Sequence, residues 1–202
     1  VNFSSKDSVL ATAKAFEDVK NGFWRRDLFK GNNLKGKKIG ILGLGRVGKQ
    51  VAKYADAFDM QVGYYDIDEK GNTPYLKFEN LIDMFSWSDI LSIHIPLTAA
   101  NQNFVSKVLL DELGPDSYVI NTSRGSIVDE KHLCSLIESN KIKGFAADVL
   151  KNEISIGDAV ATQELVVLAK KGFNVLVTPH IAGATFESMA LTEEFESEKI
   201  LK

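Results

Sequence analysis

The sequence predicts an α/β protein with a doubly wound parallel sheet. Short apolar runs alternate with stretches of helical periodicity along most of the chain, a glycine-rich turn joins the first run to a helix, and polar side chains follow directly after several runs. Parallel strands need long crossover connections, and helices supply them. The alternation therefore favours a parallel sheet with helices on both faces.

The elements follow from local patterns taken in chain order. Strands are expected where an apolar run ends at a turn signal, at residues 38–42, 61–65, 75–78, 89–95, 117–121, 142–149 and 174–178. Helices are expected where apolar residues recur every three or four positions, at residues 79–85, 106–113, 129–140 and 157–171, and from about 185 onward. Pro96 suits a strand end because it has no N–H for the ladder, and Gly114-Pro115 suits a helix end.

The turn after the first strand carries three glycines, Gly43, Gly45 and Gly48, spaced G-x-G-x-x-G. In such a turn the first glycine allows a sharp reversal, the second lets the backbone approach a pyrophosphate, and the third lets the helix pack on the strand. The helix N-terminus then offers unpaired N–H groups and a partial positive charge to the phosphates. The spacing predicts a dinucleotide site, although glycine-rich loops also occur in other contexts.

The residues that follow the glycines support this interpretation. Apolar side chains recur at intervals of three and four, which predicts an amphipathic helix with its apolar stripe on the sheet; they are Val47, Val51, Tyr54, Ala55 and Phe58. A helix of this kind directly after the glycines is the context that a dinucleotide site requires.

The second strand ends at Asp66, 18 residues beyond Gly48. An acidic residue at this place accepts hydrogen bonds from the adenosine ribose. Its carboxylate would repel a 2′-phosphate, and neither Ile67 nor Asp68 offers the positive charge that NADP needs, so the sequence predicts NAD. The alternatives are FAD or another nucleotide, and an aspartate that meets only solvent.

The bulk properties exclude several function classes. With 202 residues and 45% hydrophobic composition the chain can bury a full core, and its net charge of −3 gives no reason to expect nucleic acid as a partner. No apolar stretch approaches the length of a membrane span, so no membrane partner is expected. The single cysteine, Cys134, is expected to be buried. Because it has no partner for an internal disulfide, it fits a reducing compartment, which favours the cytoplasm. Three scattered histidines and no cysteine pair predict no metal site.

Polar residues follow the ends of the later strands as well. Because the carboxyl ends of parallel strands share one edge of the sheet and neighbouring strands lie about 4.8 Å apart, these residues are expected to meet in one crevice. Arg124, Glu153 and His180 follow three such strands. Taken singly, an arginine here is usually a surface ion-pair partner and a histidine after proline often caps a turn.

Beside a nicotinamide the three side chains would form an acid–base site. Arg124 has a permanent charge and a forked shape that suit a substrate carboxylate. Glu153 could hold one nitrogen of His180, whose imidazole would take the hydroxyl proton as hydride leaves. This chemistry is the oxidation of a 2-hydroxy acid or the reduction of a 2-keto acid. His94 is expected to shape the cofactor pocket.

Five segments together resemble the D-isomer-specific 2-hydroxyacid dehydrogenase family: residues 34–48, 92–98, 120–129, 147–153 and 178–185. The resemblance implies a Rossmann-type NAD-binding domain and assigns Arg124, Glu153 and His180 as the catalytic residues. It implies a small 2-hydroxy or 2-keto acid as substrate. The residues expected at the cofactor are Gly43, Gly45, Arg46, Val47, Gly48, Asp66, His94, Pro96, Thr122, Ser123, Asp148 and Gly183.

The resemblance also implies a division of the chain. Residues 1–33 are expected to form an interdomain and dimerisation helix with its connector, 34–184 the NAD-binding domain, and 185–202 a helix that leads toward a substrate domain, which is largely absent. Family members dimerise around the interdomain helix, where Phe16, Phe23 and Trp24 fall, so a homodimer is expected. Corepressors with the same fold that sense NAD(H) are the alternative function.

Two positions depart from the family pattern. Ile154 stands where proline usually follows the glutamate, and the segment through Lys171 is longer and more helical, so the loop of Glu153 is expected to sit differently. Asp59 occupies a common glycine position, which an aspartate tolerates.

Overall fold

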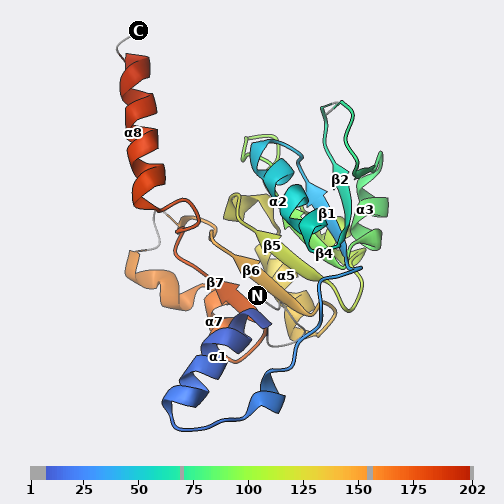
Figure 1. Ribbon diagram of the computed structural model, residues 1–202. Coiled ribbons are helices and arrows are strands. Elements are labelled where there is room, and N and C mark those ends of the chain that lie inside the picture. The colour runs from blue at the N-terminus through green and yellow to red at the C-terminus, as the bar shows by residue number, and fades with distance from the viewer. Residues whose placement is uncertain (1–7, 69–70, 154–156, 201–202) are drawn as a thin grey trace.

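The computed structural model describes residues 8–68, 71–153 and 157–200 of the chain. Within them, seven parallel strands form one sheet in the order β3-β2-β1-β4-β5-β6-β7 (Figure 1). The strands are β1 (Lys38–Leu42), β2 (Gln61–Tyr65), β3 (Leu76–Lys77), β4 (Ile90–Ile93), β5 (Tyr118–Asn121), β6 (Gly144–Ala147) and β7 (Val175–Val177). The strand order reverses between β1 and β4, so the doubly wound prediction is confirmed. The carboxyl ends of these two strands are where a sheet of this kind places its ligand crevice.

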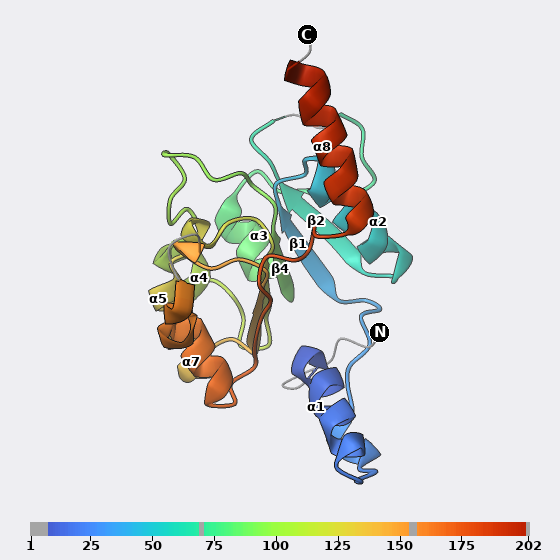
Figure 2. The same cartoon turned by 90° about the vertical axis from the view of Figure 1, so that its left-hand side faces the viewer.

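Helices cover both faces of this sheet. Figure 2 shows α3, α4, α5 and α7 on one side and α2 on the other. Their bounds are α2 (Arg46–Ala57), α3 (Leu81–Trp87), α4 (Lys107–Asp111), α5 (Glu130–Glu138) and α7 (Glu164–Lys170). Short 3-10 turns are η1 (Arg26–Phe29), η2 (Gly125–Ile127) and η3 (Gly157–Thr162). Two clusters of buried apolar side chains fill the two interfaces, the larger one beneath α3, α4, α5 and α7.

Two helices lie outside these layers. Helix α1 (Ser8–Lys20) lies beside β7, and α8 (Phe186–Ile200) stands away from the sheet at the opposite end of the molecule (Figure 1). Among the described helices, none is both long and apolar enough to cross a membrane.

The prediction of which α2 side chains face the sheet is wrong in part. The side chains that face the sheet are small, namely Gly48, Ala52 and Ala55, whereas Val47, Tyr54 and Phe58 are more than half exposed. A Cβ on Gly48 would lie 2.1 Å from the carbonyl oxygen of Gly43, so the helix sits directly on the glycine loop. Because the approach is this close, small residues fill the interface and the larger apolar ones are turned outward.

Most elements are shorter than the sequence predicts. The run 142–149 contains only the four residues of β6, and the helix expected at 157–171 is a 3-10 turn followed by α7. Apolar residues continue beyond a strand because the turns after it are also buried, as Val149 and Leu150 are. The burial of Cys134 is confirmed, and Asp59 adopts the left-handed conformation at φ 57°. Ile154 lies outside the described residues.

Candidate active site at the carboxyl edge of the sheet

The glycine loop turns from β1 into α2 at the point where the strand order reverses. Gly43 has φ +92°, and a Cβ there would meet the backbone of His94 at 3.0 Å, so only glycine fits this turn. Gly45 faces open space and precedes the first residue of α2. The first and third glycines are therefore required by the fold, while the second leaves room for a ligand beside the helix N-terminus.

Asp66 follows β2 and lies against this loop. Its Oδ2 accepts a hydrogen bond of 2.7 Å from the N–H of Leu44, and its Oδ1 accepts one of 2.9 Å from the N–H of Asp68. Asp66 is only half-buried. The structure therefore brings together the two features from which the sequence predicts a dinucleotide.

His94 follows β4 on the other side of the crevice. Its Nε2 shares a hydrogen bond of 2.8 Å with Oγ of the buried Ser92, and burial lowers the pKa of His94 to about 4. The imidazole is therefore neutral at physiological pH and adds no charge to this edge of the sheet. Two residues further, Pro96 is exposed, and its carbonyl oxygen accepts a hydrogen bond from the side chain of Asn101.

The segment after β5 is held by Asn121, which the sequence analysis missed. Its buried side chain accepts the N–H of Ser123 at 3.0 Å and donates to the carbonyl oxygen of Arg124 at 3.0 Å, so it closes the turn from both ends. The Ser123 hydroxyl donates to the carbonyl oxygen of Ile95, which ties the turn to the neighbouring strand end. An asparagine directly before a short polar segment was the available signal, because Asn side chains close such turns.

Arg124 extends from this turn into solvent at the crevice. One guanidinium nitrogen donates to the carbonyl oxygen of Ser123 at 2.7 Å, which leaves the remaining donors of the fork for a ligand. Gly125, also missed, follows it; a Cβ there would lie 2.3 Å from the peptide atoms that join Leu150 to Lys151. The turn carrying Arg124 is thus packed directly against the loop that carries Glu153.

The structure joins Glu153 and His180. Oε1 of Glu153 lies 2.8 Å from Nδ1 of His180, although the residues are 27 positions apart. Oε2 of Glu153 accepts the N–H of Leu150 at 3.3 Å, which orients the carboxylate. His180 itself has φ 54°, a strained value for a histidine, and its ring is about half exposed. With Nδ1 engaged, Nε2 is the nitrogen that can meet a ligand.

The remaining expected residues lie at the same edge with different surroundings. Thr122 is exposed after β5, Gly183 faces open space after His180, and Arg46 and Val47 are exposed at the start of α2. Asp148 is almost fully buried, and its carboxylate binds the backbone around His180. Among the described residues, no group of three His, Cys, Asp or Glu side chains is arranged to hold a metal.

Comparison with known proteins identifies the family of this chain. Residues 9–182 match the family model described as D-isomer specific 2-hydroxyacid dehydrogenase, NAD binding domain. The chain is 35% identical to a putative 2-hydroxyacid dehydrogenase, YoaD, of Bacillus subtilis, over 87% of this chain and 51% of that protein. It is 34% identical to a glyoxylate reductase of Thermofilum pendens, over 88% and 51%. The chain thus spans about half the length of these curated relatives.

Solved structures of related enzymes are also similar to this chain. The D-lactate dehydrogenase from Aquifex aeolicus, complexed with NAD and lactic acid, superposes with a TM-score of 0.82 at 27% identity, over 95% of this chain and 60% of that one. An acyclic imino acid reductase in complex with NADPH and D-Arg gives a TM-score of 0.75 at 28% identity, with the same coverage. By the family match over most of its length, this chain belongs to the D-isomer-specific 2-hydroxyacid dehydrogenases and contains their NAD-binding domain.

Proposed function

We propose that this chain is the cofactor-binding part of an NAD-dependent oxidoreductase that interconverts a D-2-hydroxy acid and the corresponding 2-keto acid. The observation that carries the proposal is the 2.8 Å hydrogen bond between Nδ1 of His180 and Oε1 of Glu153, at the sheet edge that also carries the glycine loop. Two of the relatives are named for small acids, as glyoxylate reductase and D-lactate dehydrogenase, which supports this substrate class.

The crevice fits a dinucleotide. The open space at Gly45 and the carboxylate of Asp66 beside the loop are suited to a pyrophosphate and a ribose. The cofactor, when bound, supplies the acceptor or donor of the hydride. The residues proposed to hold it are Gly43, Gly45, Arg46, Val47, Gly48, Asp66, His94, Pro96, Thr122, Ser123, Asp148 and Gly183.

The chain's own side chains supply the acid–base chemistry. Arg124 binds the substrate carboxylate through the part of its fork that is not bonded to Ser123, and this fixes the substrate's orientation. Nε2 of His180 takes the proton from the substrate hydroxyl in oxidation and returns one to the carbonyl oxygen in reduction. Glu153 orients the ring by its hydrogen bond to Nδ1.

Asp66 makes NAD the preferred cofactor in this proposal. A 2′-phosphate would lie near a carboxylate that already accepts N–H groups from Leu44 and Asp68. One structural relative holds NADPH, so the preference is a property to be tested on this chain. The expected result is that NADH binds at least about tenfold more tightly than NADPH, equivalent to about 1.4 kcal/mol.

The test has two parts. NADH fluorescence titration of this chain should give saturable binding with a dissociation constant below about 1 mM, and an absence of binding at that concentration contradicts the proposal. The whole protein from which the chain derives should reduce members of a panel of 2-keto acids with NADH, and His180→Gln should abolish that turnover. A whole protein that binds NADH and reduces none of the panel would support an NAD(H)-sensing corepressor instead.

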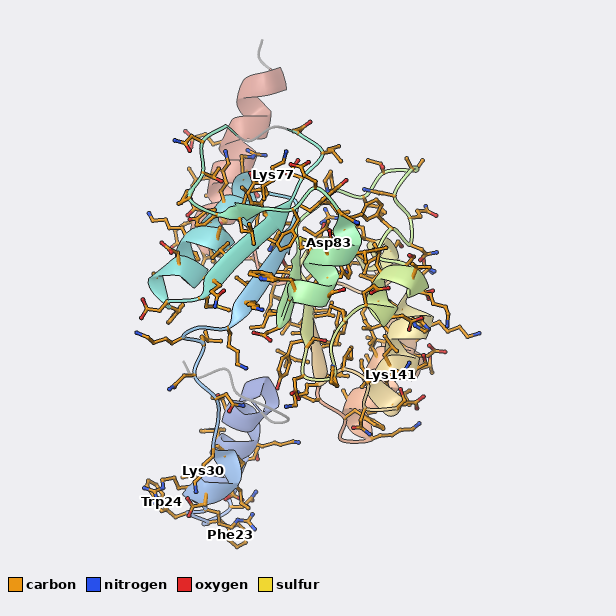
Figure 3. All side chains as sticks on the ribbon, turned by 90° about the vertical axis from the view of Figure 1, so that its right-hand side faces the viewer. Phe23, Trp24, Lys30, Lys77, Asp83 and Lys141 are labelled. Atoms are coloured by element: carbon orange, nitrogen blue, oxygen red, sulfur yellow. The ribbon has the colours of Figure 1, made fainter. Side chains whose placement is uncertain are left out.

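The proposal extends to assembly and compartment. Phe16, Phe23 and Trp24 are exposed on α1 and its connector, with Trp24 at 86%. Figure 3 shows Phe23 and Trp24 at the tip of this segment, away from the sheet. We propose that residues 1–33 form an interdomain helix with its connector, 34–184 the NAD-binding domain and 185–202 the helix toward the substrate domain. The exposed aromatic side chains support a homodimer formed through the first of these segments. The cytoplasm is the proposed compartment, because a single buried cysteine, Cys134, suits a reducing environment. Sedimentation of the whole protein with and without Trp24→Ala tests the dimer.

A further inference from the structure

The turn that leads from β6 to Glu153 must be held in place if Glu153 is to meet His180. Lys151 and Asn152 form this turn and are exposed, and Asn152 has φ 59°, which is uncommon for a residue other than glycine. Backbone of this kind keeps one shape only where its surroundings enforce it. The position of Glu153 therefore depends on the contacts that anchor the turn.

Two carboxylates accept neighbouring N–H groups of this segment. Oε2 of Glu153 accepts the N–H of Leu150 at 3.3 Å, which closes the turn on itself. Oε1 of Glu130 accepts the next N–H, that of Lys151, at 3.0 Å, although Glu130 lies 21 positions earlier in the chain. Of these two bonds, the second is the one that connects the turn to another element, the start of α5.

Glu130 and Gly125 act on the same peptide group. Gly125 packs against the peptide that joins Leu150 to Lys151, and Glu130 accepts the N–H of that peptide. Close packing limits how near the turn can come, while a hydrogen bond limits how far it can move away. Both residues belong to the short segment that begins with Arg124, so this segment sets where the turn lies relative to Arg124.

The cap of α5 does not account for Glu130. Asp129 caps this helix, and its side chain accepts the N–H of His132 at 3.1 Å. Glu130 is partly buried, and this burial raises its pKa to about 7; Glu164 on α7 adds to the shift, whereas the N–H and the charge of Lys151 oppose it. A carboxyl in surroundings that disfavour its charge needs a compensating hydrogen bond, and the bond from Lys151 provides one. Residues that break a local rule in this way are expected at functional sites.

We propose that Glu130 is a positioning residue of the acid–base site, one that holds the turn after β6 through the N–H of Lys151 and so keeps Glu153 within reach of Nδ1 of His180. The inference rests on the proposed function, because it gives Glu130 a task in the chemistry of Glu153 and His180. Glu130 touches neither substrate nor cofactor in this assignment and acts through Glu153.

The pair Glu130→Met and Glu130→Gln tests this role. Methionine has a similar length but offers only a weak acceptor, so the N–H of Lys151 loses its partner, whereas glutamine keeps a carbonyl oxygen at the same reach. The readout is the histidine ring region of the ¹⁵N–¹H NMR spectrum of this chain, with the His180 signal assigned through His180→Gln. In Glu130→Met the signal is expected to move toward its position in Glu153→Gln, where the partner of the ring is weakened. In Glu130→Gln it is expected to stay in place.

Two further variants make the test specific. Glu130→Asp keeps the charge but is one methylene shorter, which draws the carboxylate away from Lys151, so it should move the His180 signal as Glu130→Met does. It keeps the proposal testable even if Glu130→Met does not fold. Glu138→Met is the matched control, because Glu138 is an exposed glutamate on the same helix and pairs with Lys171. It is expected to leave the His180 signal unchanged.

Turnover and NADH binding give an independent readout. In the whole protein, kcat for 2-keto acid reduction should fall about tenfold or more in Glu130→Met and Glu130→Asp, since a misplacement of about 1 Å can cost on the order of 100-fold. Glutamine at this position should restore kcat to within about threefold of the unsubstituted protein. The NADH dissociation constant of this chain should stay within about threefold in all these variants, because the glycine loop belongs to another segment.

The outcomes separate the positioning role from its alternatives. An unchanged His180 signal in both Glu130→Met and Glu130→Asp would overturn the proposal. A loss of kcat in Glu130→Gln as large as that in Glu130→Met would overturn it as well, because the acceptor for Lys151 would then not be what matters. If the signal moves as expected but the whole protein reduces no 2-keto acid, the positioning of Glu153 stands and the proposed function fails.

Discussion

The two halves of the crevice are built in different ways. The half proposed to bind the nucleotide, here the nucleotide half, comes from the continuous segment β1 to β2 together with His94 after β4. Its surface is mostly backbone, namely glycines and a helix N-terminus, with the side chains of Asp66 and His94 beside it. The half proposed for acid–base chemistry, here the acid–base half, comes from three segments after β5, β6 and β7. It is made of side chains joined by hydrogen bonds, above all His180 to Glu153 and Asp148 to the turn around His180.

This difference determines how each half responds to substitution. A site made of backbone tolerates no added atoms where strands and helices touch, but it has few side chains to lose. A site made of side chains from distant segments depends on the loops that hold them, so its function can be lost while the fold remains. Substitutions at the tightly packed glycines of the first half should therefore lower stability and NADH binding together, whereas substitutions in the second half should lower turnover and leave NADH binding in place.

The largest effect is expected from Gly48→Ala in the nucleotide half. A Cβ there would lie 2.1 Å from the carbonyl oxygen of Gly43, and neither backbone can move without displacing α2 from β1. The free energy of unfolding should fall by about 3 kcal/mol, and NADH binding should be lost with it. Urea unfolding and NADH titration measure both.

Gly45→Ala is the matched control for that substitution. Nothing lies within 4 Å of the added Cβ, so the free energy of unfolding should change by less than about 0.5 kcal/mol. NADH binding should nevertheless weaken, because the methyl group occupies the space proposed for the pyrophosphate. Equal destabilisation by the two substitutions would contradict the roles given to these glycines.

The second prediction concerns Gly125→Ala in the acid–base half. Its Cβ would lie 2.3 Å from the backbone of Leu150 and Lys151, so the loop that carries Glu153 must shift. A loss of about 2 kcal/mol in stability is expected. NADH should still bind, while the whole protein loses turnover and the NMR signal of His180 moves. Retained turnover would show that the close contact between the Arg124 turn and the loop of Glu153 is not needed for catalysis.

The same difference explains what the sequence could predict. The glycine loop, Asp66 and the strands around them follow local rules of turn and periodicity, and the structure places them as expected. The stripe on α2 was predicted wrongly because hydrophobicity identifies large apolar side chains, whereas closeness of packing decided that Gly48, Ala52 and Ala55 face the sheet. The close contact of Gly125 and the hydrogen bonds of Asp148 join distant segments, and no local pattern encodes them, whereas the turn closed by Asn121 is local and had a signal in the sequence.

Stability against acid should depend on His94 in the nucleotide half. Burial lowers its pKa from 6.5 to about 4, so between these values the unfolded chain binds a proton that the folded chain does not. The stabilisation is complete above pH 6.5 and is lost as the pH falls toward 4, by on the order of 2 kcal/mol for a partly exposed ring. His94→Gln should remove this dependence when unfolding is measured at pH 7 and pH 5. Ser92→Ala keeps the imidazole and should retain it; an unchanged pH dependence in His94→Gln would contradict the assignment.

In the acid–base half the dependence on pH should run the opposite way, because of Glu130 at the start of α5. Its Oε1 accepts the N–H of Lys151 at 3.0 Å, and burial raises its pKa to about 7, with Glu164 adding to the shift and Lys151 opposing it. The folded chain therefore binds the proton more tightly, so the contribution is complete below pH 4.5 and is lost as the pH rises through 7.

Glu130→Gln tests this last and smallest effect, since glutamine keeps the acceptor for Lys151 but cannot ionise. The variant should match the unsubstituted chain at pH 5 and unfold at a higher urea concentration at pH 8. Glu138→Gln changes an exposed carboxylate on the same helix, paired with Lys171, and should show no gain at pH 8. If Glu130→Gln gives the same stability difference at both pH values, the carboxyl does not titrate between them. The loss of stability toward acid pH assigned to His94 would then be the one pH dependence left of the two predicted here.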